Sequence, residues 1–473
     1  KRISGDTMKM IVRKELLEHL KTVQFAVLLA ASVLLFAVNS LVFIQRYTRL
    51  GAEYRLHVGQ EEQHPSTIGT SLYRSPSPLL FMAEGGEGSV PRGFGLGPKR
   101  TLTPYPAGTA NFKMPDVPEL DWAFIIKIVF SLYVILLGFE AISGEKERGT
   151  LRLVLSNPIG RLRLLTGKYL AVILSAAIPL VVGLFISLIA IGLFVPAVMG
   201  AENLVRIVFF FILALAYLSL FAFLSLLVSS LIPRSSLTLL VLLAFWIFSA
   251  FFVPDTSGII AQKFSRVPSE YQMAKLLGPT MEKEVFSRLE RIRERIQKGE
   301  LKTEKDVREE ANRAYEEGQD GVRKLYDDYD NAMRERAALA QRISRASPAA
   351  LFQYAAEAVA ETGPQAEARF LRDIRSYSRS YDAYVLKKVG KVVGTSPWSF
   401  STGVTLDGKY IDLQSPFPQE YQGDKSDMPR FSESRPSLVD GLHNGLWDIA
   451  GLLVWNILLA GLAFSVFLRT DVR

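Results

Sequence analysis

The 473-residue sequence contains no cysteine and only four histidines. Without cysteine the chain has no disulfides, no thiol nucleophile and no cysteine-rich metal site. The histidines, His19, His57, His64 and His443, are scattered along the chain and lack the spacing of metal ligands. We therefore predict that the chain binds no metal and that any exposed domain is held together by packing alone.

Catalytic motifs are also missing from the sequence. The nearest approach to a phosphate-binding loop is GRLRLLTGKY at residues 160–169. A Walker A loop needs glycine five residues before its Gly-Lys pair and Ser or Thr after it, but Leu162 and Tyr169 occupy those positions. Neither a Gly-x-Ser-x-Gly elbow nor a His-Glu-x-x-His helix occurs. We expect a chain that is not catalytic by itself and binds no cofactor directly.

What the sequence does contain is long apolar runs. Each has close to the ~20 residues that a helix needs to cross the hydrocarbon core of a membrane. The predicted spans are residues 24–45, 122–142, 169–194, 207–232, 237–253 and 445–468. A buried hairpin in a soluble protein could explain one or two such runs, but six favour an all-α membrane protein.

Charge is distributed unevenly between the segments that separate these runs. Segments 1–23, 143–168, 233–236 and 469–473 hold fifteen Lys/Arg against six Asp/Glu. Segments 46–121 and 254–444 are balanced, with eight and thirty residues of each sign. By the positive-inside rule, the basic segments and both termini lie in the cytoplasm of a multi-pass plasma membrane protein, which we expect to be a bacterial inner membrane protein. The net charge of +8 therefore reports topology and does not indicate nucleic-acid binding.

The cytoplasmic leader, residues 1–23, has helical periodicity. Val12, Leu16 and Leu20 recur every four residues, with charged residues off that stripe. This pattern predicts a helix lying in the membrane interface, and a frayed leader is the alternative. Because no small-residue cleavage site follows the first apolar run, that run is interpreted as a retained anchor.

The two external segments differ in character. Residues 46–121 are rich in Pro and Gly and are predicted to be irregular. Residues 254–444 carry helix-start signals at Thr303 with Asp306 and at Ser347-Pro348. Predicted helices lie near 280–298, 303–317, 321–346, 348–362 and 364–389. This large, mainly helical insertion is expected to engage an external protein, a substrate or its own dimer mate.

The cytoplasmic loop 143–168 contains more than a chain reversal needs. Acidic residues near its start are favourable at a helix N-terminus. Gly149 allows the backbone freedom where the next helix begins, and Asn157-Pro158 is expected to end that helix. Alternating charges and an amphipathic stretch from Leu151 could contact a cytosolic surface; an ordinary solvated loop is the alternative. The residues proposed for this contact are Glu145, Lys146, Glu147, Arg148, Gly149, Thr150 and Leu151, with Arg234 in the second short cytoplasmic turn.

Three elements of this region resemble ABC-2 type permeases of ATP-binding-cassette transporters. They are ISGEKERGTL at residues 142–151, SNPI at residues 156–159 and Gly167-Lys168. The sequence is most similar to the branch that includes permeases linked to multicopper-enzyme maturation and gliding motility.

The resemblance implies that the loop is a coupling helix resting on a separate ATPase subunit. Two copies of the ATPase, which use ATP and Mg, would bind a dimer of permease chains. The complex would either export a hydrophobic or amphipathic substrate or pass force to an external partner. The two external insertions are departures from a minimal member, so the resemblance does not identify the substrate.

Ionisable residues inside the spans are few. Lys127 and Asp448 lie near external ends and Glu140 near the cytoplasmic end, where side chains are expected to reach water. A proton-driven transporter would carry charge at mid-membrane, so that class is disfavoured. The main rival is a membrane-anchored structural or receptor protein that works through its helical ectodomain, with the loop at residue 145 serving only as a turn.

Overall fold

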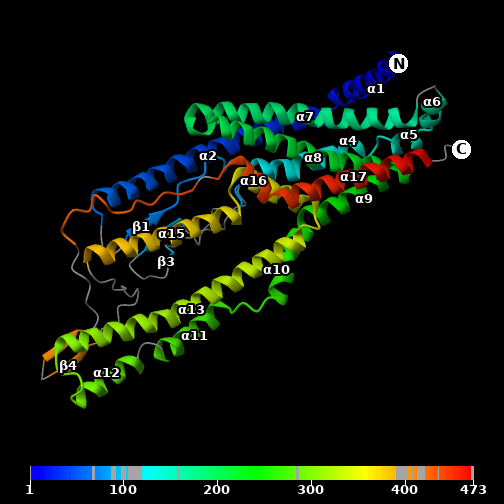
Figure 1. Ribbon diagram of the computed structural model, residues 1–473. Helices are drawn as coiled ribbons and strands as arrows, with labels where there is room; N and C mark the ends of the chain where they lie inside the picture. Colours follow the sequence, from blue (N-terminus) through cyan, green and yellow to red (C-terminus); the bar gives the residue numbers. More distant parts are fainter. Residues whose placement is uncertain are drawn as a thin grey trace.

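The computed structural model describes residues 2–65, 70–86, 92–96, 103–104, 120–156, 160–283, 287–389, 403–406, 409–412, 421–434 and 436–469. Within these residues, six helical stretches are long and apolar enough to cross a membrane. The all-α membrane architecture is thereby confirmed, and the strands form only two small antiparallel sheets. Figure 1 shows a helical bundle, with most of the helices between residues 270 and 389 extending beyond one of its ends.

The six spans are built as follows. The first is α2 (Val23–Gln63), the third α7 (Arg161–Phe194), the fourth α8 (Ala201–Leu231) and the sixth α17 (Leu446–Arg469). The second consists of α3 (Trp122–Ile125), the π-helix η2 (Ile126–Phe130) and α4 (Ser131–Gly138). The fifth consists of α9 (Ser235–Ile247), the π-helix η4 (Phe248–Phe252) and α10 (Val253–Phe264).

The second and fourth spans form the centre of the bundle. In their most apolar stretches, 61% and 56% of the residues are buried, against 28% and 22% in the fifth and sixth. Aromatic rings fill the centre: Trp122 lies edge-on to Phe36 at 5.8 Å between centroids, and Phe210 lies 5.9 Å from Trp122. The fifth and sixth spans therefore present most of their surface outward.

Small residues let the helices approach closely. A Cβ at Gly183 of α7 would lie 2.4 Å from the ring of Phe36 on α2, and one at Gly138 of α4 would lie 2.5 Å from Ser225 on α8. Ser40 and Ser187 hydrogen-bond between α2 and α7 at 2.7 Å. Lipid supplies no hydrophobic drive between helices, so such close contacts and hydrogen bonds hold the spans together.

The leader forms the helix α1 (Arg2–Leu20), which packs along α7. Val12, Leu16 and Leu20 are half-buried, as their four-residue spacing indicates, and Arg13 and Lys14 are exposed. The His19 ring hydrogen-bonds Ser175 of α7 at 3.0 Å, and burial lowers the pKa of His19. Figure 1 places the N-terminus, the C-terminus and the loop after the second span at the same end of the bundle.

The first external segment is more regular than predicted. Helix α2 does not end near residue 45 but continues to Gln63, so its 41 residues measure about 60 Å against a hydrocarbon core of about 30 Å. Arg46, which ends the apolar run, pairs with Glu84 at 3.0 Å and does not end the helix. Beyond it, β1 (Thr70–Tyr73), β2 (Gly93–Leu96) and β3 (Thr103–Pro104) form a sheet in that order.

The described part of residues 254–444, the second segment predicted to be external, is mainly helical, as predicted. Its helices are α11 (Glu270–Met281), α12 (Ser287–Gln297), α13 (Glu304–Ser344), α14 (Pro348–Ala360), α15 (Pro364–Val389) and α16 (Leu438–Asn444). The strands β4 (Gly403–Leu406) and β5 (Lys409–Asp412) pair with each other. Helices α10 to α13 extend away from the bundle as an arm, and α15 lies apart from that arm, toward the outer part of α2 (Figure 1).

Helix caps in this segment follow the sequence signals. The Asp306 amide donates to Thr303 at 3.2 Å, and the amides of Ala349 and Ala350 donate to Ser347. Gly318, which was expected to end a helix, lies inside the continuous helix α13. An isolated glycine costs a helix only about 1 kcal/mol, which the surrounding helix formers outweigh.

We predict that Gly183→Leu destabilises the bundle by about 2–4 kcal/mol, because the new side chain overlaps Phe36 on α2. Thermal unfolding of the detergent-solubilised protein measures the effect. Gly461→Leu is the matched control, since no atom outside its own helix lies within 4 Å of a Cβ at Gly461. Equal unfolding temperatures for the two variants would contradict the packing described here.

Candidate functional site

The loop after the second span folds into two short helices. Helix α5 covers Ser143–Glu147 and helix α6 covers Thr150–Ser156. Between them Gly149 has a φ of +70°, and nothing lies within 4 Å of where a Cβ would be. The backbone conformation, not lack of space, therefore favours glycine at this corner. The stop predicted at Asn157-Pro158 lies outside the described residues.

The start of the loop is fixed to the end of the fourth span. The backbone amides of Ile142 and Ser143 donate to the Ser229 hydroxyl at 3.0 and 2.8 Å, and that hydroxyl donates to the Phe139 carbonyl at 2.9 Å. One buried side chain thus binds three backbone groups of the turn between α4 and α5. Movement of the loop is consequently tied to movement of α8.

A buried ion cluster holds the loop to two other elements. The Lys168 ammonium on α7 lies 2.8 Å from Glu145 Oε1 on α5 and 3.0 Å from Glu15 Oε1 on α1. Its side chain is only 3% exposed. Lys168 is therefore the centre of the junction between the leader, the loop and the third span.

The next two charged residues of the loop also bind within the chain. Lys146 donates to the Ser230 carbonyl at the end of α8. The Glu147 carboxylate accepts from the Ser235 amide at 3.2 Å, at the N-terminus of α9, where negative charge is favourable. Glu145, Lys146 and Glu147 thus connect the loop to the third, fourth and fifth spans.

The remaining predicted residues divide between core and surface. Leu151 is buried in a cluster that includes Ile142, Leu165 and Phe467. Arg148, Gly149, Thr150 and Arg234 are exposed.

The exposed side chains form what we call the exposed loop face, defined as Glu147, Arg148, Thr150, Arg152, Leu153 and Arg234. Leu153, at 68% exposure, is its large apolar residue. The face is therefore basic, with one apolar contact point, and it suits a protein surface that offers acidic groups around an apolar pocket.

This geometry makes Glu145 part of the fold and not a solvated surface charge. Glu145→Lys would place a second ammonium beside Lys168 in a buried site. Within the described residues, no group of three or more His, Asp or Glu is placed to hold a metal ion. The arrangement leaves the exposed loop face accessible to another molecule.

Comparison with known proteins finds a family match over almost the whole chain. The sequence pattern of the ABC-2 family transporter proteins matches residues 10–472. Over 123 residues the chain is 34% identical to the Probable ABC transporter permease protein NosY of Pseudomonas aeruginosa, covering 24% of this chain and 44% of that protein. A protein of the same name from Stutzerimonas stutzeri is 33% identical over 92 residues, covering 20% and 33%. The matched stretches span less than half the length of either relative.

We predict that Lys168→Met lowers the free energy of unfolding by about 3–5 kcal/mol, because it leaves Glu15 and Glu145 buried without their shared cation. Arg163→Met is the matched control on the same helix, where the exposed side chain is expected to contribute less than about 0.5 kcal/mol. Both are measured by thermal or denaturant unfolding in detergent. A Lys168→Met protein as stable as the control would show that the ion cluster contributes nothing.

Proposed function

This chain belongs to the ABC-2 family of transporter proteins, and on that premise we propose that it is the membrane-spanning permease subunit of an ATP-driven exporter. The ATP and Mg are used by a separate ATPase, of which two copies bind a dimer of permease chains. The substrate is hydrophobic or amphipathic, or the complex passes force to an external partner. The chain itself catalyses no reaction.

The observation that carries this proposal is the position of the exposed loop face. Apart from Arg234, it lies on or between two short helices that are bonded to the third, fourth and fifth spans through Lys168, Ser230 and Ser235. A protein that pushes or pulls on this face would therefore move several spans together. A simple chain reversal would need none of these bonds.

The chemistry of the face indicates what its partner offers. Three arginines and one glutamate give it a net positive charge, and Leu153 projects among them. We propose that the ATPase presents a groove with acidic groups around an apolar pocket. Charge complementarity of this kind fixes orientation and register more than it adds affinity.

We further propose that this face and both termini lie in the cytoplasm of a bacterial inner membrane. The charge distribution supports that orientation, because the positive excess lies entirely in the segments at this end of the bundle. The helical arm extends from the opposite end of the bundle and belongs to a segment of balanced charge, which supports an external position for it.

Charge reversal tests the docking surface. Arg148→Glu combined with Arg152→Glu is predicted to reduce the amount of ATPase that co-purifies with the tagged chain about tenfold, equivalent to about 1.4 kcal/mol. Because both side chains are exposed, folding should be unaffected.

Lys298→Glu combined with Lys302→Glu is the matched control, with the same charge change on exposed residues of the external segment. This control is expected to retain the ATPase. If the double variant at residues 148 and 152 retains it equally well, the loop is only a topological turn.

Cysteine labelling tests the orientation, and the cysteine-free sequence gives no background. Met333→Cys on α13 is predicted to react with a membrane-impermeant thiol reagent added outside intact cells, and Ser156→Cys on α6 to react only after the membrane is opened. Both positions are exposed, so access to each depends on the membrane alone. The reverse labelling pattern would overturn the orientation.

A further inference from the structure

Helix α14 covers the outer end of the bundle. It lies in the chain between α13 and α15, which belong to the two parts of the external helical segment, residues 254–444, that we call the ectodomain. The preceding helix α13 belongs to the extended arm, and the following helix α15 leads toward the outer part of α2 (Figure 1). Phe352 of α14 stacks on Tyr217 of α8, with ring centroids 4.6 Å apart. The start of α14 is fixed to the fifth span, because the Ser347 hydroxyl donates to the Ser249 carbonyl in η4 at 2.5 Å.

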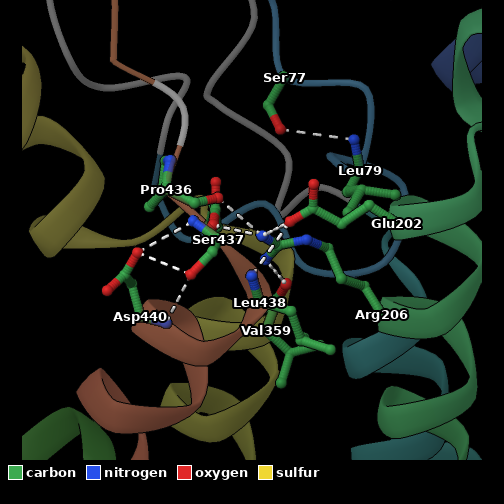
Figure 2. Close-up of polar contacts among 10 residues, drawn as sticks. Ser77, Leu79, Glu202, Arg206, Val359, Pro436, Ser437, Leu438 and Asp440 are labelled. Atoms are coloured by element: carbon green, nitrogen blue, oxygen red, sulfur yellow. Dashed lines mark hydrogen bonds and ion pairs between the residues drawn. The ribbon is translucent and has the colours of Figure 1, made fainter.

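The other end of α14 is clamped to the fourth span by Arg206. Its guanidinium donates to the Val359 carbonyl at 3.0 Å and to the Pro436 carbonyl at 2.9 Å, and it pairs with Glu202 at 2.8 Å (Figure 2). It also pairs with Glu361, directly after α14, at 2.7 Å. This buried cation joins α8, the end of α14 and the segment before α16.

The sixth span reaches the same region through Asp448. Its carboxylate accepts two hydrogen bonds from Arg345, at 2.7 and 3.0 Å. Arg345 directly follows α13, so this pair joins the foot of the arm to α17. Asp448 is only 2% exposed, which corrects the expectation that it reaches water.

The contact with the second span is of a different kind. The Lys127 ammonium donates to Gln353 Oε1 at 3.0 Å, and Gln353 Nε2 donates to Glu357 Oε1 at 3.0 Å. The amide of Gln353 thus turns its oxygen toward the cation and its nitrogen toward the carboxylate. Burial raises the pKa of Glu357 to about 7, and the hydrogen bond from Gln353 opposes that rise.

Three features mark this relay as a place where the structure can change. Lys127 lies in the π-helix η2, and π-helical turns inside spans occur frequently at functional sites. A cavity of about 40 Å³, with room for water, lies beside Glu357, Arg345 and Asp448. A link through a neutral amide is also weaker than the direct ion pairs at Arg206 and Arg345.

We propose that Gln353 is a positioning residue for transport: by joining Lys127 of the second span to Glu357, it makes α14 the element that converts movement of the spans into movement of the ectodomain. The second span is the one whose other end carries α5 and the exposed loop face. The inference rests on the proposed function and adds to it the route by which ATP-driven movement reaches the two parts of the ectodomain, before and after α14.

The experiment measures ectodomain movement in the complex of this chain with its co-purifying ATPase, reconstituted in lipid nanodiscs. Spin labels are attached at Met333→Cys on α13 and Leu204→Cys on α8, both exposed positions. ATP is expected to shift the distance between the labels in the otherwise unchanged chain. Gln353→Leu is expected to reduce that shift at least about fivefold while ATP hydrolysis changes less than about twofold.

Matched variants distinguish loss of the Lys127–Gln353–Glu357 link from a general loss of folding or stability. Gln365→Leu, an exposed glutamine one helix further along the chain, should leave the shift unchanged. Lys127→Arg keeps the charge and the donors and should retain the shift, whereas Lys127→Met should lose it. These two substitutions also test the relay if Gln353→Leu fails to fold.

The outcomes distinguish this inference from the proposed function. A full distance shift in Gln353→Leu or in Lys127→Met overturns the inference and leaves the proposed function standing. The inference is also overturned, and the proposed function again left standing, if the chain with Gln353 and Lys127 intact binds the ATPase and hydrolyses ATP but the distance between the labels does not change. A chain that recruits no ATPase at all overturns both.

Discussion

A charge buried among apolar helices has to find its partners inside the chain, and the rest of this structure depends on how that constraint is met. The bundle concentrates its buried ion pairs at its two ends, around Lys168 at one and around Arg206 and Asp448 at the other. Taking an ion out of water costs several kcal/mol, which only close ion pairs with further hydrogen bonds offset. Each cluster therefore fixes the elements that supply it, and both join elements far apart in the sequence.

The second span connects the two ends. At one end it turns into α5, where Glu145 enters the Lys168 cluster; at the other, Lys127 reaches α14 through Gln353. It is also the most buried span, so it is packed against neighbours along most of its length. In our proposal, this packed helix carries a displacement at the loop to the opposite end of the bundle. The π-helix at Ile126–Phe130 is the part of it that departs from regular α-helical geometry.

Much of this architecture could be predicted from the sequence, because hydropathy and charge are properties of contiguous residues. The six apolar runs correspond to the six candidate spans in the structure, and the capping residues Thr303 and Ser347 lie at the helix starts predicted for them. The end of the first span could not be predicted this way: hydropathy falls at Arg46, but the backbone stays helical to Gln63 because a helix needs no membrane around it to continue. In the same way, α13 passes through Gly318, since one weak position does not end a long helix.

The partners of the loop charges were beyond sequence reasoning for a physical reason. Glu145, Lys146, Glu147 and Arg148 look equivalent in a solvated helix, and only tertiary packing decides that the first three bind within the chain while Arg148 is exposed. Lys168 lies 23 residues from Glu145 and 153 from Glu15, and no local pattern records such pairs. The relay at Gln353 was likewise invisible, because a glutamine inside an apolar helix carries no signal of its partners.

The central claim, that the exposed loop face docks on an ATPase, is tested most directly by photo-crosslinking in living cells. A photoreactive amino acid replaces Leu153 on the loop face or, as a control, Leu174, an exposed residue within the third span. The account predicts that Leu153 yields a crosslinked protein, identified by mass spectrometry, that carries a Walker A motif, and that Leu174 does not. Crosslinks from Leu153 to lipid alone, or to the same products as Leu174, would contradict it.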